Sequence, residues 1–148
     1  MVSKVDTRDH NLDILQSLGY KKFKNTTIFQ NGENFILSPA VSENSNGKYW
    51  FDIREVNLNR INEKSFLLVR VVPDIFILER INSISSLLDI SKMDNRPNSG
   101  NVWGLKIYLI NSLNKAVLYN LKDTTKKIET HLFRKGEIID AFYKNQTK

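Results

Sequence analysis

Residues 47–58 read GKYWFDIREVNL, and this stretch decides how the rest of the chain is interpreted. It has the aromatic and β-branched residues of a buried β-strand, yet Asp52, Arg54 and Glu55 lie inside it. The neighbours that favour burial are Tyr49, Trp50, Phe51, Ile53, Val56 and Leu58. Charge in apolar surroundings is costly unless it is paired, bound to a metal or used in function. We therefore expect the functional chemistry of the chain in this strand.

The spacing of two charged residues makes this expectation specific. Side chains at i and i+2 of a strand point to the same face, so Asp52 and Arg54 are expected to open onto one cleft. The alternative is that the two residues form an ion pair with each other at the edge of a sheet.

On the N-terminal side of this strand, the sequence predicts a helix and then a hairpin. Asp9 or Asn11 would cap the helix and Gly19 would end it. Its apolar stripe consists of Leu12, Ile14, Leu15 and Leu18. Strands over 26–30 and 34–41 follow, joined at Asn31-Gly32, which is a strong hairpin signal.

On the C-terminal side, apolar runs predict four more strands. Residues 66–72 and 75–81 are separated by Pro73-Asp74, and residues 102–110 and 115–121 form a second hairpin. Between these pairs we expect a short helix from Asn82 or Ser83 and a loop over 91–101. From Asp123 onward we expect helices, on the pattern of Ile128, Leu132, Phe133, Ile138, Ile139 and Phe142.

The order of elements predicts a single α+β domain over residues 1–148. Its central sheet would be mixed and mostly antiparallel, with an N-terminal helix, a short middle helix and C-terminal helices. The chain has no cysteine and two histidines, so disulfides, zinc ribbons and thiol or histidine-based catalysis are not expected. Acids interrupt the N-terminal segment where a signal peptide needs an apolar core, which predicts a cytoplasmic protein that does not enter membranes.

The net charge of +6 is concentrated at the two ends of the chain. Residues 115–148 carry eight Lys/Arg against four Asp/Glu, whereas residues 25–114 carry nine of each. Basic surface of this kind suits a polyanion such as DNA. The alternative is that the lysines only keep the protein in solution.

Pro39-Ala40, followed after eleven residues by Asp52-Ile53-Arg54, resembles the signature of the PD-(D/E)xK restriction-endonuclease-like superfamily. The resemblance covers residues 8–110. It implies a restriction-endonuclease-like core in which two carboxylates hold Mg²⁺ for phosphodiester hydrolysis. It also implies a place in a restriction or defence system.

The chain departs from that signature at two positions. Ala40 stands where the family has an aspartate, and Arg54 stands where it has a lysine. The resemblance therefore implies a site in which Asp52 and Glu43, or Glu33 in its place, bind the metal while Arg54 stabilises charge. Arginine cannot accept a proton at neutral pH, so it would not act as a base.

Three further features are candidates for binding. Arg70, inside the apolar run 66–72, needs a carboxylate or a phosphate as its partner, and Glu55, Asp74 or Asp52 would supply the carboxylate. The loop after Asp94 offers Arg96, Asn98 and Trp103 for contacts to bases or phosphates. The basic tail offers Lys122, Lys126, Lys127, Arg134 and Lys135, on a helix.

The sequence therefore leaves three functions open. The first is a DNA-binding protein with a nuclease-like core. The second is a recognition module that binds nucleic acid without cleaving it. The third is a protein-interaction subunit that associates with a partner, or with itself, through an exposed sheet edge.

Overall fold

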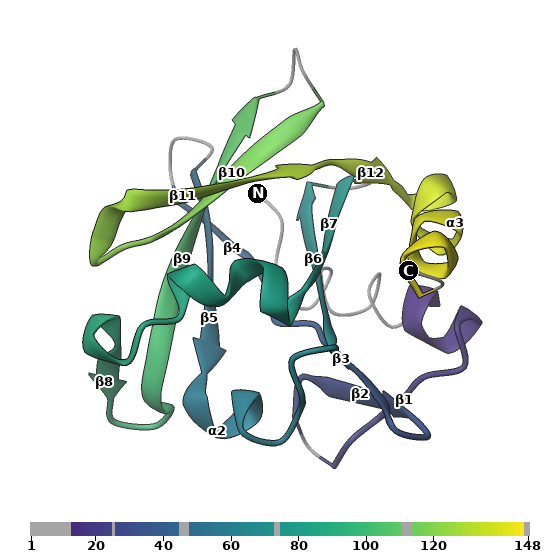
Figure 1. Cartoon of the computed structure of the whole chain (residues 1–148), viewed down its shortest axis with the longest axis horizontal. Helices are drawn as coiled ribbons and strands as arrows, with labels where there is room; N and C mark the ends of the chain where they lie inside the picture. The colour runs from purple at the N-terminus through teal and green to yellow at the C-terminus, as the bar shows by residue number, and fades with distance from the viewer. Residues whose placement is uncertain (1–12, 25, 45–47, 73–74, 111–113, 147–148) are drawn as a thin grey trace.

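The computed structural model describes residues 13–24, 26–44, 48–72, 75–110 and 114–146, in which the strands form two six-stranded sheets. Sheet A has the order β1-β2-β3-β6-β7-β12 and sheet B the order β11-β10-β9-β5-β4, with β8 paired to β9 (Figure 1). The strands of sheet A are β1 (Lys21–Lys22), β2 (Ile28–Asn31), β3 (Asn34–Leu37), β6 (Phe66–Val72), β7 (Ile75–Arg80) and β12 (Phe133–Arg134). Those of sheet B are β4 (Ser42–Asn44), β5 (Lys48–Arg54), β8 (Asp94–Arg96), β9 (Gly100–Ile110), β10 (Lys115–Asn120) and β11 (Asp123–His131).

The helical elements are short except for the last one. They are a segment at 13–17, α2 (Glu55–Leu58), the 3-10 helices η1 (Ile81–Leu87) and η2 (Ile90–Lys92), and α3 (Lys135–Gln146). Of the strand pairs described, β3 with β6 is parallel and the others are antiparallel. The predicted α+β class, with its N-terminal, middle and C-terminal helices, is confirmed.

Apolar side chains are buried in two layers. The inner core lies between the two sheets and includes Phe51 and Trp103 of sheet B with Val69 of sheet A. The second core covers the other face of sheet A, where Leu15 of the N-terminal helix and Phe142 of α3 pack. These two helices lie together at one side of the molecule (Figure 1). Both helices therefore cover sheet A, and the face of sheet B that points away from sheet A, here called the outer face, lies at the opposite side.

The first hairpin forms as predicted, with its turn one residue later. Asn31 still pairs with Asn34 at the end of the strands, so the two-residue turn is Gly32-Glu33. Gly32 has φ of +62°, a conformation that glycine adopts without a steric penalty. The proposed helix caps Asp9 and Asn11, and the Pro73-Asp74 turn, lie outside the described residues.

Three sequence predictions about local structure are wrong. The strand predicted to run to Leu58 ends at Arg54, and Glu55–Leu58 form the helix α2. Residues 123–131 form strand β11, because Ile128, Thr130 and Leu132 fit a period of two as well as the helical stripe did. The Thr130 hydroxyl bonds Glu79 of β7, which fixes this face inward. The segment 91–101 is not a loop: it contains η2 and β8, and β8 pairs with the start of β9. In the described part of the chain, no helix is long and apolar enough to cross a membrane.

Candidate nucleic-acid interface

Strand β5 divides its residues between the inner core and the outer face of sheet B. Tyr49, Phe51 and Ile53 are at most 6% exposed and pack between the sheets. Asp52 and Arg54 alternate with them and therefore point to the outer face. The strand keeps two charges because one of its faces is not part of the core.

Asp52 and Arg54 open onto one cavity, as their spacing predicts. The cavity has a volume of about 350 Å³ and lies where the ends of β2 and β3 meet β5. Pro39 and Ala40 line the same cavity, so the fold brings both halves of the sequence signature together. The side chain of Arg54 is also fixed, since its Nε donates a hydrogen bond to the Ser99 carbonyl oxygen at 3.1 Å.

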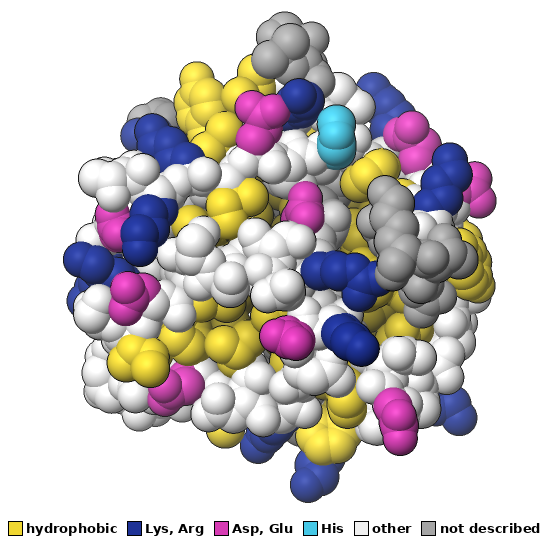
Figure 2. All heavy atoms as spheres, in the orientation of Figure 1, with side chains coloured by type: hydrophobic (Ala, Val, Ile, Leu, Met, Phe, Trp, Pro, Cys, Tyr) yellow, Lys and Arg dark blue, Asp and Glu magenta, His cyan; other side chains and the backbone are white. Residues whose placement is uncertain are grey.

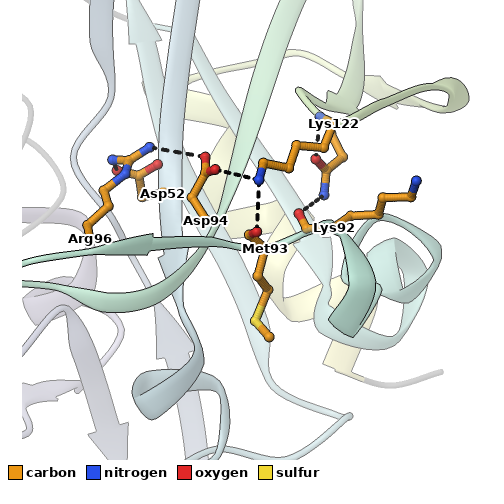
Figure 3. A network of polar contacts seen from close by, with 7 residues as sticks. Asp52, Lys92, Met93, Asp94, Arg96 and Lys122 are labelled. Atoms are coloured by element: carbon orange, nitrogen blue, oxygen red, sulfur yellow. Dashed lines mark hydrogen bonds and ion pairs between the residues drawn. The ribbon is translucent and has the colours of Figure 1, made fainter.

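The ion-pair partner of Asp52 is Arg96 rather than Arg54. Arg96 reaches from β8 across β9 and donates a hydrogen bond to Asp52 on β5 (Figure 3). Its second terminal nitrogen lies 3.9 Å from Asp94, and Lys122 Nζ lies 2.7 Å from the other oxygen of Asp94. Asp52, Asp94, Arg96 and Lys122 thus form one chain of alternating charge across sheet B, which we call the ion-pair chain.

Gly104 of β9 lies beneath the contact between Arg96 and Asp52. Gly104 pairs directly with Asp52 across the sheet, and the guanidinium passes over it. A Cβ at this position would lie 3.6 Å from Asp52 Oδ1, 3.8 Å from Arg96 Nη2 and 3.1 Å from the Leu121 side chain. A Cβ would thus meet Asp52 and Arg96 at ordinary van der Waals distance, and its close contact would be with the end of the Leu121 side chain.

Lys122 and Arg96 also favour the ionised form of Asp94. The Lys122 ammonium group, hydrogen-bonded to Asp94, lowers the pKa of that carboxyl, and the charge of Arg96 adds to the effect. Lys122 Nζ donates a further hydrogen bond to the Met93 carbonyl oxygen at 3.1 Å. Two of the cations proposed for nucleic acid, Arg96 and Lys122, are thus already engaged within the protein.

The proposed metal pair, Asp52 with Glu43, is not assembled. Glu43 pairs with Tyr49 across β4 and β5, so it shares the face of Tyr49 and not that of Asp52. Burial, followed by a hydrogen bond to Glu43, raises the pKa of Tyr49 to about 12. Glu33, the alternative acid, lies in the turn between β2 and β3 and lines a different pocket. Among the described residues no three His, Cys, Asp or Glu side chains cluster as a metal site.

The other candidates of the predicted loop are separated. Trp103 is 2% exposed and donates its indole N–H to the Asp89 carbonyl oxygen at 2.8 Å, so it cannot stack on a base. Asn98 lies exposed in the turn between β8 and β9, where it lines a shallow pocket with Arg54. Arg70 is 4% exposed on the helix-covered face of sheet A, on the side away from Asp52 and Glu55. Asp74 is outside the described residues.

The basic tail does not form the single helical surface that the sequence predicted. Lys126 and Lys127 are neighbours on strand β11 and point to opposite faces of sheet B. Arg134 and Lys135 lie at β12 and α3, next to sheet A, and Lys135 Nζ lies 3.8 Å from Asp13. Of these four residues, only Lys127 belongs to the outer face.

The register of sheet B reveals a feature that the sequence reading missed. Trp50 pairs with Lys106, Lys106 with Tyr119, and Tyr119 with Lys127. Four side chains, alternately aromatic and cationic, thus form one row across β5, β9, β10 and β11, which we call the outer row. Neighbouring strands lie about 4.8 Å apart, so the row spans roughly 15 Å. Lys127 Nζ lies 5.9 Å from the centre of the Tyr119 ring.

The outer row has polar and aromatic neighbours that keep this part of the sheet open to solvent. Tyr108, two residues after Lys106 on the same face, is 64% exposed. Arg96 lies over the Trp50 ring, 5.8 Å from its centre, and so joins the row to the ion-pair chain. Lys106, Tyr108 and Tyr119 alternate with buried residues along β9 and β10, but only the register shows which residues stand side by side.

Figure 2 shows how charged side chains are distributed on one face of the molecule. On the face drawn in Figure 2, basic and acidic side chains are interspersed, and no broad area carries basic side chains alone. The position of an interface is therefore indicated by the ordered outer row better than by the net charge.

Comparisons with protein-family models, with curated proteins and with solved structures each found no match. The resemblance to the PD-(D/E)xK superfamily gains no support from them and stays a prediction. The functional argument therefore depends on the side chains of sheet B themselves.

Proposed function

We propose that this chain is a nucleic-acid-binding protein that uses the outer face of sheet B and does not cleave its ligand. The observation that carries the proposal is the outer row, Trp50, Lys106, Tyr119 and Lys127, set by the register of four strands. Aromatic rings on a sheet provide stacking surfaces for bases, and lysines between them provide contacts to phosphates. DNA is the nucleic acid that the sequence resemblance favours.

A binding role fits the state of Asp52 better than a catalytic role. A metal-dependent nuclease needs carboxylates that converge on the cation, whereas Asp52 contacts Arg96 and Glu43 points to the other face. A place in a restriction or defence system, and a cytoplasmic location, belong to the proposal only through the sequence reading.

The experiment measures the affinity for labelled DNA by fluorescence polarisation, with and without Mg²⁺, and follows cleavage on a gel. The variant is Lys127→Glu, and the matched control is Lys126→Glu, which makes the same change of charge on the opposite face of β11. We expect binding without Mg²⁺, no cleavage, and a loss of about tenfold in Lys127→Glu with a much smaller loss in the control.

Three outcomes would contradict the proposal. They are no binding at low salt, equal losses in the two lysine variants, and cleavage that requires Mg²⁺. The last would revive the nuclease interpretation, for which the common cavity of Pro39, Ala40, Asp52 and Arg54 is the supporting observation.

A further inference from the structure

The cavity beside the outer row has the lining that an unpaired nucleotide requires. Trp50, the first residue of the row, forms part of its wall. Lys22 and Arg54 line it as cations, and the cavity also borders Asn57 and Ser38, which are 3% and 8% exposed. An aromatic surface, buried polar groups and cations are thus present in one hollow.

The volume of the cavity indicates the size of the ligand that it can hold. Its volume of about 350 Å³ is at the lower end of the range of small-molecule sites, which begins near 300 Å³. A hollow of this volume can hold one nucleotide.

The polar groups that border the cavity are held in place by the protein. The Ser38 hydroxyl donates to the Leu68 carbonyl oxygen at 2.8 Å, which fixes the orientation of this side chain. Asn57 Oδ1 accepts from Arg60 at 3.3 Å, which orients the amide. Fixed donors and acceptors on the edge of a base give recognition at low entropic cost.

We propose that this cavity takes one unpaired base of a single strand, stacked against Trp50, with the adjoining phosphate on Lys22 and Arg54. This inference rests on the proposed function and makes it specific for single strands. A base inside a duplex would have to leave its stack to enter, which is energetically unfavourable. The strand then continues from the cavity along the outer row, which begins at Trp50.

The test compares a single-stranded 12-mer with the corresponding duplex by fluorescence polarisation at one salt concentration. The first variant is Lys22→Glu, with Lys21→Glu as its control. Both are exposed residues of β1, and only Lys22 lines the cavity. The second variant, Ala40→Leu, fills the cavity from a half-buried position, and thermal unfolding verifies its fold.

We expect the wild type to bind the single strand about tenfold more tightly than the duplex. Lys22→Glu and Ala40→Leu should each remove most of this preference, and Lys21→Glu should keep it. Binding of the single strand should quench the fluorescence of Trp50, which a Trp50→Phe variant assigns, because Trp103 is buried. A free mononucleotide should displace the strand from the wild type at millimolar concentration but not from Ala40→Leu.

Results that contradict the cavity inference differ from results that contradict the proposed function. If the single strand and the duplex bind equally, or if Lys21→Glu and Lys22→Glu behave alike, the cavity inference is wrong and the proposed function stands. If Ala40→Leu keeps the wild-type preference, the cavity inference is also wrong. If neither nucleic acid binds, the proposed function fails and the inference fails with it.

Discussion

Tyr49 shows how one buried residue makes the stability of this protein depend on pH. Its ring is 6% exposed between the sheets, and burial with the hydrogen bond to Glu43 raises its pKa to about 12. A tyrosine of the unfolded chain ionises near pH 10. The stabilisation that comes from keeping Tyr49 neutral is therefore fully present below pH 10 and is lost as the pH rises toward 12.

Tyr49→Phe should remove part of this loss of stability at high pH. Loss of the hydrogen bond to Glu43 should lower the free energy of unfolding at pH 7 by about 1 kcal/mol. Because phenylalanine does not ionise, the variant should lose less stability than the wild type between pH 10 and 12. Urea unfolding over this range measures both effects, with the exposed Tyr108→Phe as control. Parallel curves for wild type and Tyr49→Phe would show that Tyr49 does not contribute.

The candidate site shows why single residues were easier to predict than their partners. The i, i+2 spacing was enough to place Asp52 and Arg54 in one cavity, because alternation along a strand is a local rule. The partner of Asp52 could not be deduced in this way. Arg96 is 44 positions away and reaches Asp52 because β8 turns back on β9.

At the scale of elements, local patterns predicted strands where apolar residues alternate or run together. The hairpins β2–β3 and β9–β10 were predicted because their turns and apolar strands are continuous in sequence. Strand β11 was mistaken for a helix because Ile128 and Leu132 fit both periods, and β8 was missed because a three-residue polar strand has no apolar pattern. Both gain their stability from pairing with a neighbour, which local sequence does not encode.

The β8–β9 hairpin should affect the affinity for single-stranded DNA. It holds Arg96 against Asp52, so Asp52→Asn should weaken this half-buried ion pair and cost roughly 1–2 kcal/mol of stability. The same change removes a negative charge from the outer face and releases a guanidinium toward the ligand. We expect affinity for single-stranded DNA to rise roughly two- to fivefold, measured by fluorescence polarisation.

The control for this variant is Asp140→Asn on α3, which makes the same change of charge beside sheet A. A nuclease would behave differently, since Asp52→Asn would abolish cleavage. Reduced affinity in Asp52→Asn, or an equal gain in both variants, would contradict the assignment of the outer face.

At the scale of the whole molecule, the sequence predicted the class of fold but not its division into two sheets. The α+β composition and the mostly antiparallel pairing follow from elements that are adjacent in sequence. The division depends on distant pairings, such as β3 with β6 and β12 with β7, which close sheet A around the first and last parts of the chain. That division also determines which basic residues share a face, so the distribution of charge along the sequence did not predict the outer row.

The fold separates the basic residues along the proposed path of a strand from those beside α3, such as Lys135. The salt dependence of binding should reflect only the residues along the path. Cations that face the proposed path of a strand are Lys22, Arg54, Lys106 and Lys127. Four phosphate contacts to a single strand give a slope of about −3 for the logarithm of the association constant against the logarithm of salt concentration. Lys127→Glu should reduce the magnitude of this slope by about 0.7, whereas Lys135→Glu, beside sheet A, should leave it unchanged. Titrations at five salt concentrations measure the slope. A wild-type slope near zero, or an equal reduction in the two variants, would mean that binding does not follow the outer row.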